Sequence, residues 1–378
     1  MNQLELAIKK RIHQAGGRLP FAEFMTEALY HPEWGYYNRA GMTIGEQGDF
    51  YTAPMVHPIF GECVARQIFR MWEHLGCPAS FAIVEMGAGT GALAHDLLRE
   101  WDRLMESQSG SQKLQRVPEV RYLIVEQSGV LQKIQKDVTA DVARERIGWY
   151  QTLQEVEGYG ELIGAVLSNE LFDALPVHRL IRDDGMWKEL YVSFVETGET
   201  RRFEETIAPL SDEKLAELLP ASLSAEWETG DRWTVCPLAG HVLADMAACL
   251  RRGFLLTIDY GDRSAAAFEP FDRSREIRCY YKQTLVDDPL VRIGEQDITA
   301  DVDFGYLEQV GSRLGLFTVD YMTQGEFLEK FGFLKQVEIM QRKAFLDLQA
   351  DFDLQKMLTL YLPQGLGSAC KVLVQAKL

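Results

Sequence analysis

Residues 83–91 read IVEMGAGTG, an apolar run that ends in three closely spaced glycines. The run is typical of the end of a buried strand, and the apolar spacing over Leu93–Leu104 predicts a helix after it. Glycine lets the backbone turn sharply and approach a ligand, because no Cβ stands in the way. The stretch therefore predicts a ligand-binding turn between the first strand and the first helix of an α/β sheet.

Further apolar runs and helical patterns alternate along the chain. The runs are Phe81–Glu85, Tyr122–Val125, Leu162–Leu167, Phe254–Ile258 and Lys371–Ala376, and the helical patterns cover Ile59–Leu75, Leu93–Leu104, Val130–Gln135 and Ala239–Leu250. Continuous apolar strands that alternate with helices predict a parallel sheet covered on both faces. The fold class is thus α/β with a Rossmann-like sheet, into which the C-terminal strand returns.

The departures from this alternation suggest three parts. We expect an N-terminal helical and loop extension over residues 1–80 and a Rossmann-like core over 81–177 and 238–378. Residues 178–237 carry alternating β patterns and a charged helical run, and we interpret them as an inserted α+β substrate-binding segment. The polar stretch Ser107–Gln115 is predicted to be a surface loop.

Two carboxylates near the glycine turn indicate which ligand it binds. Glu85 precedes the glycines by two residues, where its charge would repel a pyrophosphate but suits a ligand with ammonium and sulfonium groups. Glu126 ends the second strand, well beyond the ~20-residue offset of the ribose carboxylate in dinucleotide folds. Both favour S-adenosylmethionine. A dinucleotide stays open because Gly87, Gly89 and Ala92 fit G-x-G-x-x-A, and so does a purely structural turn.

A second motif, SNELFDALPV at Ser168–Val177, directly follows a buried strand. Ligands of open α/β sheets bind at the carboxyl ends of the strands, so Asn169, Glu170 and Asp173 lie where chemistry is expected. An amide and two carboxylates can hold a guanidinium or an amine by charge-assisted hydrogen bonds. Helix capping is the alternative interpretation of the same residues. The neighbouring glycine motif favours the functional one.

Composition and spacing exclude several other classes. The chain has 378 residues and a net charge of −17, which argues against general nucleic-acid binding but not against a basic protein substrate. The six cysteines and seven histidines show no metal-ligand spacing. No apolar run approaches the ~20 residues that cross a bilayer, so we expect no membrane insertion. Residues 1–17 resemble neither a signal nor a transit peptide, which leads us to expect a cytoplasmic protein of bacterial type.

Five segments together resemble one family, the MidA-type methyltransferases, which includes the mitochondrial complex I assembly arginine methyltransferases. The segments are GDFYTAP (Gly48–Pro54), VEMGAGTG (Val84–Gly91), SNELFDALPVHR (Ser168–Arg179), IDYG (Ile258–Gly261) and GEQDITADVDF (Gly294–Phe304). Alone, the loop at 45–54 is typical of a turn and the acidic stretch at 294–304 of a solvated face. Their common order across nearly the whole chain makes the resemblance far more specific than the glycine turn.

The resemblance implies a class I S-adenosylmethionine-dependent methyltransferase that modifies an arginine of a protein substrate. It further implies that the glycine turn and the acidic end of the second strand bind the cofactor. Together with the chemistry of the motifs, this leads us to assign cofactor binding to Glu85, Gly87, Gly89, Gly91, Glu126, Gln127, Asp49, Thr52 and Asn169, and catalysis to Glu170, Asp173 and Asn169. A methyltransferase for small molecules and a non-catalytic assembly factor that binds the cofactor are the alternatives. A homodimer is compatible with the sequence. The chain departs from the family pattern at Ala88, Thr90 and Asp301, which leaves the substrate open.

Overall fold

The structure is a computed structural model that describes residues 1–39, 52–108, 118–142, 144–198, 200–219, 227–263, 277–282, 284–345 and 347–378. Packing divides the chain into two compact units. Unit 1 comprises Met1–Tyr51, Phe172–His241 and Asp262–Leu307, and unit 2 comprises Thr52–Leu171, Val242–Gly261 and Glu308–Leu378. The boundaries between the units fall at 51/52 and 171/172, within α7 (Pro237–Cys249) and α8 (Phe304–Arg313), and at the last residue of β10 (Leu250–Asp262).

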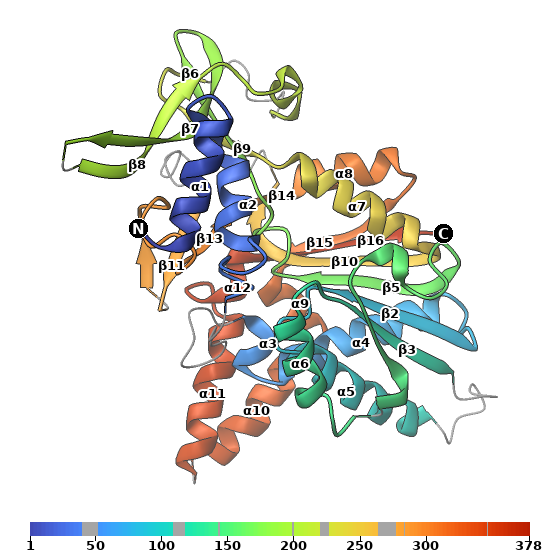
Figure 1. Ribbon diagram of the computed structural model, residues 1–378. Coiled ribbons are helices and arrows are strands. Elements are labelled where there is room, and N and C mark those ends of the chain that lie inside the picture. The colour runs from blue at the N-terminus through green and yellow to red at the C-terminus, as the bar shows by residue number, and fades with distance from the viewer. Residues whose placement is uncertain are drawn as a thin grey trace. The chain divides into compact units, whose positions relative to one another are not determined.

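Unit 2 is built on a sheet whose strands follow the order β15-β16-β10-β5-β2-β3-β4. Their bounds are β2 (Ser80–Met86), β3 (Glu119–Val125), β4 (Ile147–Tyr150), β5 (Leu162–Asn169), β10 (Leu250–Asp262), β15 (Phe317–Thr323) and β16 (Cys370–Lys377). Strands β10, β5, β2, β3 and β4 pair in parallel, whereas β16 is antiparallel to both of its neighbours (Figure 1). The predicted α/β fold with a returning C-terminal strand is confirmed.

The order of this sheet reverses beside β2. From β2 the chain proceeds to β3 and β4 on one side, and later to β5 and β10 on the other. Such a reversal opens a crevice at the carboxyl ends of the strands, which is where open α/β sheets bind ligands. Met86 at the end of β2 is in register with Ser168 of β5, so the glycine turn and the Ser168–Val177 motif begin at neighbouring strand ends.

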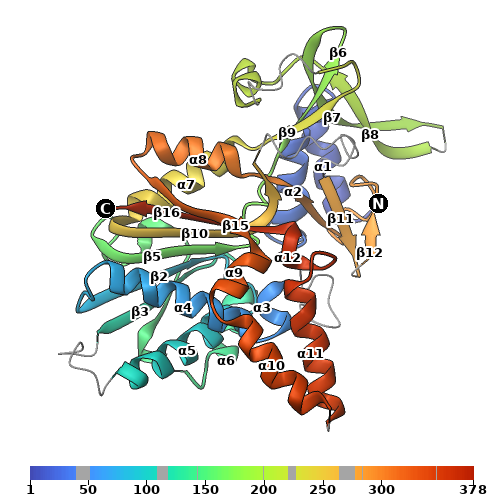
Figure 2. The same cartoon turned by 180° about the vertical axis from the view of Figure 1, so that it is seen from behind.

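The helices of unit 2 pack on the sheet or on one another. They are α3 (Ala53–Val56), α4 (Ile59–His74), α5 (Ala92–Gln108), α6 (Gly129–Val138), α9 (Gln324–Lys330), α10 (Phe333–Ala344), α11 (Leu348–Tyr361) and α12 (Leu366–Ala369), with the short turns η1 (Arg144–Arg146) and η2 (Leu153–Glu155). Trp101 of α5 stacks on Phe81 of β2 with ring centroids 5.7 Å apart. Gly61 lets α4 approach α5 closely, and α10 and α11 lie side by side (Figure 2).

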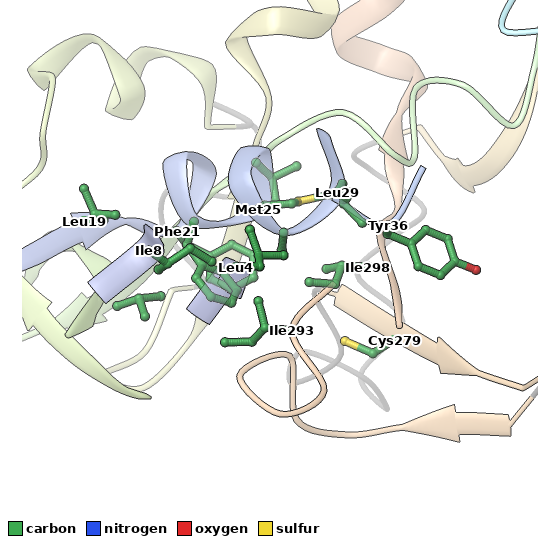
Figure 3. Packing of buried hydrophobic residues seen from close by; sticks show 14 of the residues in the cluster. Leu4, Ile8, Leu19, Phe21, Met25, Leu29, Tyr36, Cys279, Ile293 and Ile298 are labelled. Carbon is green, nitrogen blue, oxygen red and sulfur yellow. The ribbon is translucent and has the colours of Figure 1, made fainter. Parts of the chain in front are cut away.

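In the part of unit 1 that the structure describes, α1 and α2 accompany two antiparallel sheets. Its elements are α1 (Gln3–Gln14), α2 (Phe21–Tyr30), β1 (Arg18–Pro20), β6 (His178–Asp183), β7 (Met186–Thr197), β8 (Thr200–Ala208), η3 (Glu213–Leu218), β9 (Arg232–Val235), β11 (Ile277–Tyr281), β12 (Thr284–Val286), β13 (Asp297–Ala300) and β14 (Val302–Asp303). One sheet has the order β1-β7-β6-β9 with β8 on β7, and the other β12-β11-β13. Figure 3 shows Leu4, Phe21, Met25 and Ile298 among the buried side chains that join helices to strands.

The predicted elements agree with these bounds where the structure describes them. Each predicted apolar run lies in a strand of unit 2, and each predicted helical pattern coincides with a helix, except that Leu75 follows the end of α4 and Leu250 begins β10. Ser107 and Gln108 were predicted to belong to a loop but are helical, because α5 continues to Gln108; residues 109–117 lie outside the described part of the chain. Packing joins part of the 1–80 extension with the 178–237 segment in unit 1, and the functional roles assigned to these segments stay predictions.

Candidate functional site

The glycine turn joins β2 to α5 through left-handed backbone that glycine adopts readily. Gly87, Gly89 and Gly91 have φ values of 66°, 51° and 86°. The N–H of Gly87 donates to the carbonyl of Val125 on β3 at 3.0 Å, which fixes the start of the turn. A Cβ at Gly91 would lie 3.1 Å from Cα of Gln135, so α6 packs directly on the backbone of the turn. At Gly89 nothing lies within 4 Å of an added Cβ, so the turn leaves bare backbone open at that position, as a bound nucleoside requires.

Glu126 follows β3, and its carboxylate accepts hydrogen bonds from residues that come shortly after it in the chain. Its Oε1 accepts the N–H of Ser128 at 2.8 Å, and its Oε2 accepts Nε2 of Gln135 at 3.3 Å. Burial is the main cause that raises the pKa of its carboxyl, and these hydrogen bonds oppose the rise. A carboxylate has about four acceptor positions, so Glu126 keeps capacity for the hydroxyl donors of a ribose.

Gln135 connects the glycine turn to Glu126, and nothing in the sequence pointed to it. It is fully buried in α6, and its Nε2 donates both to Glu126 and, at 3.0 Å, to the carbonyl of Gly89. Its Oε1 has no hydrogen-bond partner among the described residues. A glutamine inside an ordinary helical pattern carries no motif, so only the folded chain shows that it connects the glycine turn to the carboxylate. A glycine cradle beside a buried carboxylate fits an adenosine-type ligand.

Glu85 is a buried residue of β2 rather than an exposed one. Its side chain is 2% exposed and accepts a hydrogen bond of 2.7 Å from the hydroxyl of Tyr122. Burial raises its pKa to about 7; Tyr122 opposes this rise and the charge of Glu126 adds to it. Near neutral pH the group therefore carries only part of the negative charge on which the sequence argument relied. Its assignment to cofactor binding stays a prediction.

The end of β5 presents an amide and a carboxylate side by side. Asn169 Nδ2 donates to Oε1 of Glu170 at 3.1 Å, and the same oxygen accepts the N–H of Ala53 at 3.0 Å. Glu170 thereby connects the strand end to the first residue of α3. Asn169 is 9% exposed, and its Oδ1 has no partner in the described part of the chain. A buried polar atom of this kind needs a reason, and a bound donor supplies one.

Asp259 lies beside this turn, at a position that the sequence analysis singled out only as part of IDYG. Its carboxylate is fully buried in β10 and accepts the N–H of Leu171 at 3.1 Å. No spacing rule pairs residues that lie this far apart in sequence. The pairing of β10 with β5 brings them together, with Ile258 in register with Asn169.

The remaining predicted site residues have different surroundings. Asp173 belongs to unit 1, where it is 5% exposed and its carbonyl accepts the N–H of Ala300 at 2.8 Å. Thr52 precedes α3 without a side-chain capping bond, and Gln127 is exposed just after Glu126. Asp49 lies outside the described residues, as does most of its motif. The structure thus brings together the glycines, Glu126, Asn169 and Glu170 within unit 2.

Comparison with known proteins identifies the family. Residues 63–322 match a family model described as an S-adenosyl-L-methionine-dependent methyltransferase. The chain belongs to this methyltransferase family. The family predicted from the five motifs, the predicted enzyme class and the predicted cofactor, S-adenosyl-L-methionine, are thereby confirmed.

The chain is also similar to curated eukaryotic proteins. Protein arginine methyltransferase NDUFAF7, mitochondrial, of Rattus norvegicus is 31% identical over 373 residues, covering 90% of this chain and 76% of the relative. The protein of the same name from Homo sapiens is 30% identical over 351 residues, covering 87% and 73%. These names contradict the predicted cytoplasmic, bacterial-type location, because the similar curated relatives are mitochondrial proteins. The prediction was wrong to read a location from the residues at the start of the chain.

Solved structures of this methyltransferase family are also similar. A crystal structure from Burkholderia thailandensis, described as a methyl transferase bound to S-adenosyl-homocysteine, has a TM-score of 0.84 at 27% identity and covers 99% of this chain and 92% of the other. A native structure from the same organism has a TM-score of 0.82 at 27% identity, covering 99% and 91%. Among the described residues no helix is long and apolar enough to span a membrane, and no cluster of side chains fits a metal ion.

Proposed function

We propose that this methyltransferase transfers methyl groups to an arginine side chain of a protein substrate. The observation that carries the proposal is the contact at the end of β5 between buried Asn169 and partly buried Glu170, where the amide Nδ2 donates to the carboxylate and the amide Oδ1 has no partner among the described residues. A guanidinium has only donors and needs acceptors of this kind around it. The similar relatives named as protein arginine methyltransferases support the same acceptor.

On the cofactor side, we assign the glycine turn and the end of β3. Gly87, Gly89 and Gly91 would lie against the nucleoside, and Glu126 would accept the ribose hydroxyls. The assignment also includes Glu85, Gln127, Asp49, Thr52 and Asn169. Its support is the buried contact that Gln135 makes with both the turn and Glu126.

On the acceptor side, the residues must orient a nitrogen and exclude water. When bound, S-adenosyl-L-methionine supplies a methyl group activated by a positively charged sulfur. A guanidinium has a pKa of ~13.8 and is a poor nucleophile while charged. The carboxylate of Glu170 would orient it and accept the proton that the nitrogen releases as the N–C bond forms and the bond from the methyl group to sulfur breaks, and Asn169 would hold one N–H. Asp173 is the second carboxylate in this assignment.

The proposal is tested with purified full-length protein and S-adenosyl-L-methionine carrying a labelled methyl group. Calorimetric titration first measures cofactor affinity. Lysate proteins are then incubated with the labelled cofactor, and mass spectrometry locates the label. We expect methylarginine. Labelled lysine, or label found only in small molecules, would contradict the arginine assignment, and cofactor binding without any transfer would favour a non-catalytic role.

Glu170→Gln separates the acceptor side from the cofactor side. The glutamine keeps the shape of the side chain and one acceptor for Ala53, but it removes the charge. We expect unchanged affinity for S-adenosyl-L-methionine and a transfer rate lowered by about 10- to 1,000-fold. The matched control is Glu155→Gln in η2, whose carboxylate bonds only to the nearby N–H of Gln151 in the described structure.

A homodimer stays a prediction, which sedimentation of the purified protein tests.

A further inference from the structure

Glu170 has a backbone conformation that its side chain does not favour. Its φ is 51°, in the left-handed region where L-residues other than asparagine and aspartate are uncommon. Its N–H donates to the carbonyl of Ile258 on β10 at 2.9 Å. Non-glycine residues keep such a conformation only where their surroundings fix it, and these positions gather at functional sites. Glu170 must therefore be held by its neighbours.

Asp259 is the neighbour that holds the exit of this turn. It is 0% exposed, and its Oδ2 accepts the N–H of Leu171, the first N–H after Glu170, at 3.1 Å. Its Oδ1 accepts the N–H of Tyr260 at 2.9 Å. A buried carboxylate is tolerated where donors compensate it, and backbone donors serve both oxygens here. Each oxygen of the Asp259 carboxylate is thus fixed by a backbone N–H.

The turn that Asp259 holds connects the cofactor side to the acceptor side. Leu171 packs on the glycine turn, since a Cβ at Gly87 would lie 3.0 Å from its Cδ1. Glu170 accepts the N–H of Ala53 and the amide of Asn169, which leaves Asn169 Oδ1 buried with no partner among the described residues. A change in the backbone at 170 would therefore move both candidate acceptor groups.

We propose that Asp259 is a positioning residue for methyl transfer, which acts by holding the Asn169–Leu171 turn in the geometry that orients Glu170 and Asn169. This rests on the proposed function of that pair. Misplacement of reacting groups by ~1 Å can lower a rate by about 100-fold without a change in the chemistry. Asp259 thus acts on the rate by positioning Glu170, the residue of this turn that belongs only to the acceptor side.

Asp259→Asn tests the claim with little change in volume. Its NH2 group cannot accept a backbone N–H, so one of the two hydrogen bonds is lost. We expect the initial rate of transfer at saturating cofactor to fall by about 10- to 100-fold, while the calorimetric Kd for S-adenosyl-L-methionine stays within about threefold. Hydrogen exchange at the amides of Leu171 and Ala53 should become faster. The control is Glu100→Gln, a buried carboxylate of α5 bonded to Arg66, which should lower stability but not the rate of folded protein.

A double-mutant cycle shows whether Asp259 acts through Glu170. Glycine adopts the left-handed backbone unaided, so Glu170→Gly needs no support from Asp259. In that background we expect Asp259→Asn to change the residual rate by less than about threefold, because effects that share one route do not add. Multiplied losses, a normal rate in Asp259→Asn, or a Kd that rises as much as the rate falls would each overturn the proposal.

The failure of the proposed function is distinguishable from the failure of this inference. If the wild-type protein labels lysine or a small molecule, the arginine assignment fails, and the same cycle is run on that acceptor. If it labels nothing, exchange at Leu171 and Ala53 in Asp259→Asn decides. Faster exchange supports the positioning contact, and exchange equal to that of the wild type overturns it.

Discussion

The hydroxyl of Tyr122 donates a hydrogen bond of 2.7 Å to the carboxylate of Glu85, and both side chains are buried between β2 and β3. Burial raises the pKa of both groups, that of Glu85 to about 7. A strand that leads directly into the glycine turn thus carries a group that titrates near neutral pH. The charge of the core beside the turn consequently depends on pH.

The first prediction concerns this titration. Since the pKa of Glu85 is about 7 in the folded protein and near 4.5 when unfolded, the folded state binds more protons between these values. Stability should therefore fall as pH rises through this window, by up to about 3 kcal/mol at ~1.36 kcal/mol per pKa unit. Urea unfolding from about pH 5 to pH 8 measures it.

Two variants assign the effect to Glu85. Glu85→Gln still accepts the hydrogen bond of Tyr122 but cannot ionise, so its stability curve should be flatter over the same window. Tyr122→Phe removes the donor that stabilises the charged form, so its loss of stability should be larger at high pH than at low pH, by ~1–3 kcal/mol. A Glu85→Gln curve as steep as that of the wild type would assign the titration elsewhere, with Glu126 as the next candidate.

The second prediction concerns the contact between Gly91 and Gln135. Gly91→Ala places a Cβ 3.1 Å from Cα of Gln135 and forces alanine to a φ of 86°. We expect a loss of ~1–2 kcal/mol in stability from the backbone alone, together with weaker binding of S-adenosyl-L-methionine. Thermal unfolding with and without the cofactor measures both. Gly129→Ala is the control, because nothing lies within 4 Å of the added atom and its φ is not positive.

The third prediction concerns Glu126. Glu126→Gln replaces an acceptor of hydroxyl donors with a neutral group that also carries two donors of its own. Because hydrogen bonds to a charged group contribute ~1.5–3 kcal/mol, the Kd for S-adenosyl-L-methionine should rise about 10- to 100-fold. Glu119→Gln, at the exposed start of β3, the strand that Glu126 follows, should leave the Kd unchanged. Equal affinities in both variants would remove Glu126 from the cofactor site.

The fourth prediction separates packing from function. A Cβ at Gly61 in α4 would lie 2.6 Å from Cβ of Asp96 in α5. Gly61→Ala should therefore push the two helices apart and cost ~1–3 kcal/mol of stability, while the folded fraction still binds the cofactor normally. Glu73→Ala on the exposed face of α4 should stay within ~0.5 kcal/mol of the wild type.

The strands that the sequence predicts are those with continuous apolar runs, because central strands covered on both faces leave a local signal. β4 and β15 lack that signal. β4 is only four residues long, and β15 is an edge strand whose first three residues are exposed. The glycine turn and the Ser168–Val177 motif were also local. By contrast, Gln135 and Asp259 act through contacts between distant segments, which no spacing rule shows.

Glu85 shows a different limit of the sequence. Its position before the glycines was visible, but its protonation was not, because the pKa depends on the burial that only the packed sheet imposes. Asp173 is a third case. It follows Glu170 closely in sequence, yet it falls in unit 1, whereas Glu170 falls in unit 2. Residues that are close together in one sequence motif can therefore pack in different units of the fold.

Strand β16 has a consequence for biosynthesis. It pairs with β10 on one edge and β15 on the other, yet the ribosome makes it after both. Until residues 370–377 emerge, β10 presents an unpaired edge, the kind of surface that recruits other chains into aggregates. The sheet is complete only after translation has passed this strand, so nascent chains that stop before it keep the edge of β10 unpaired.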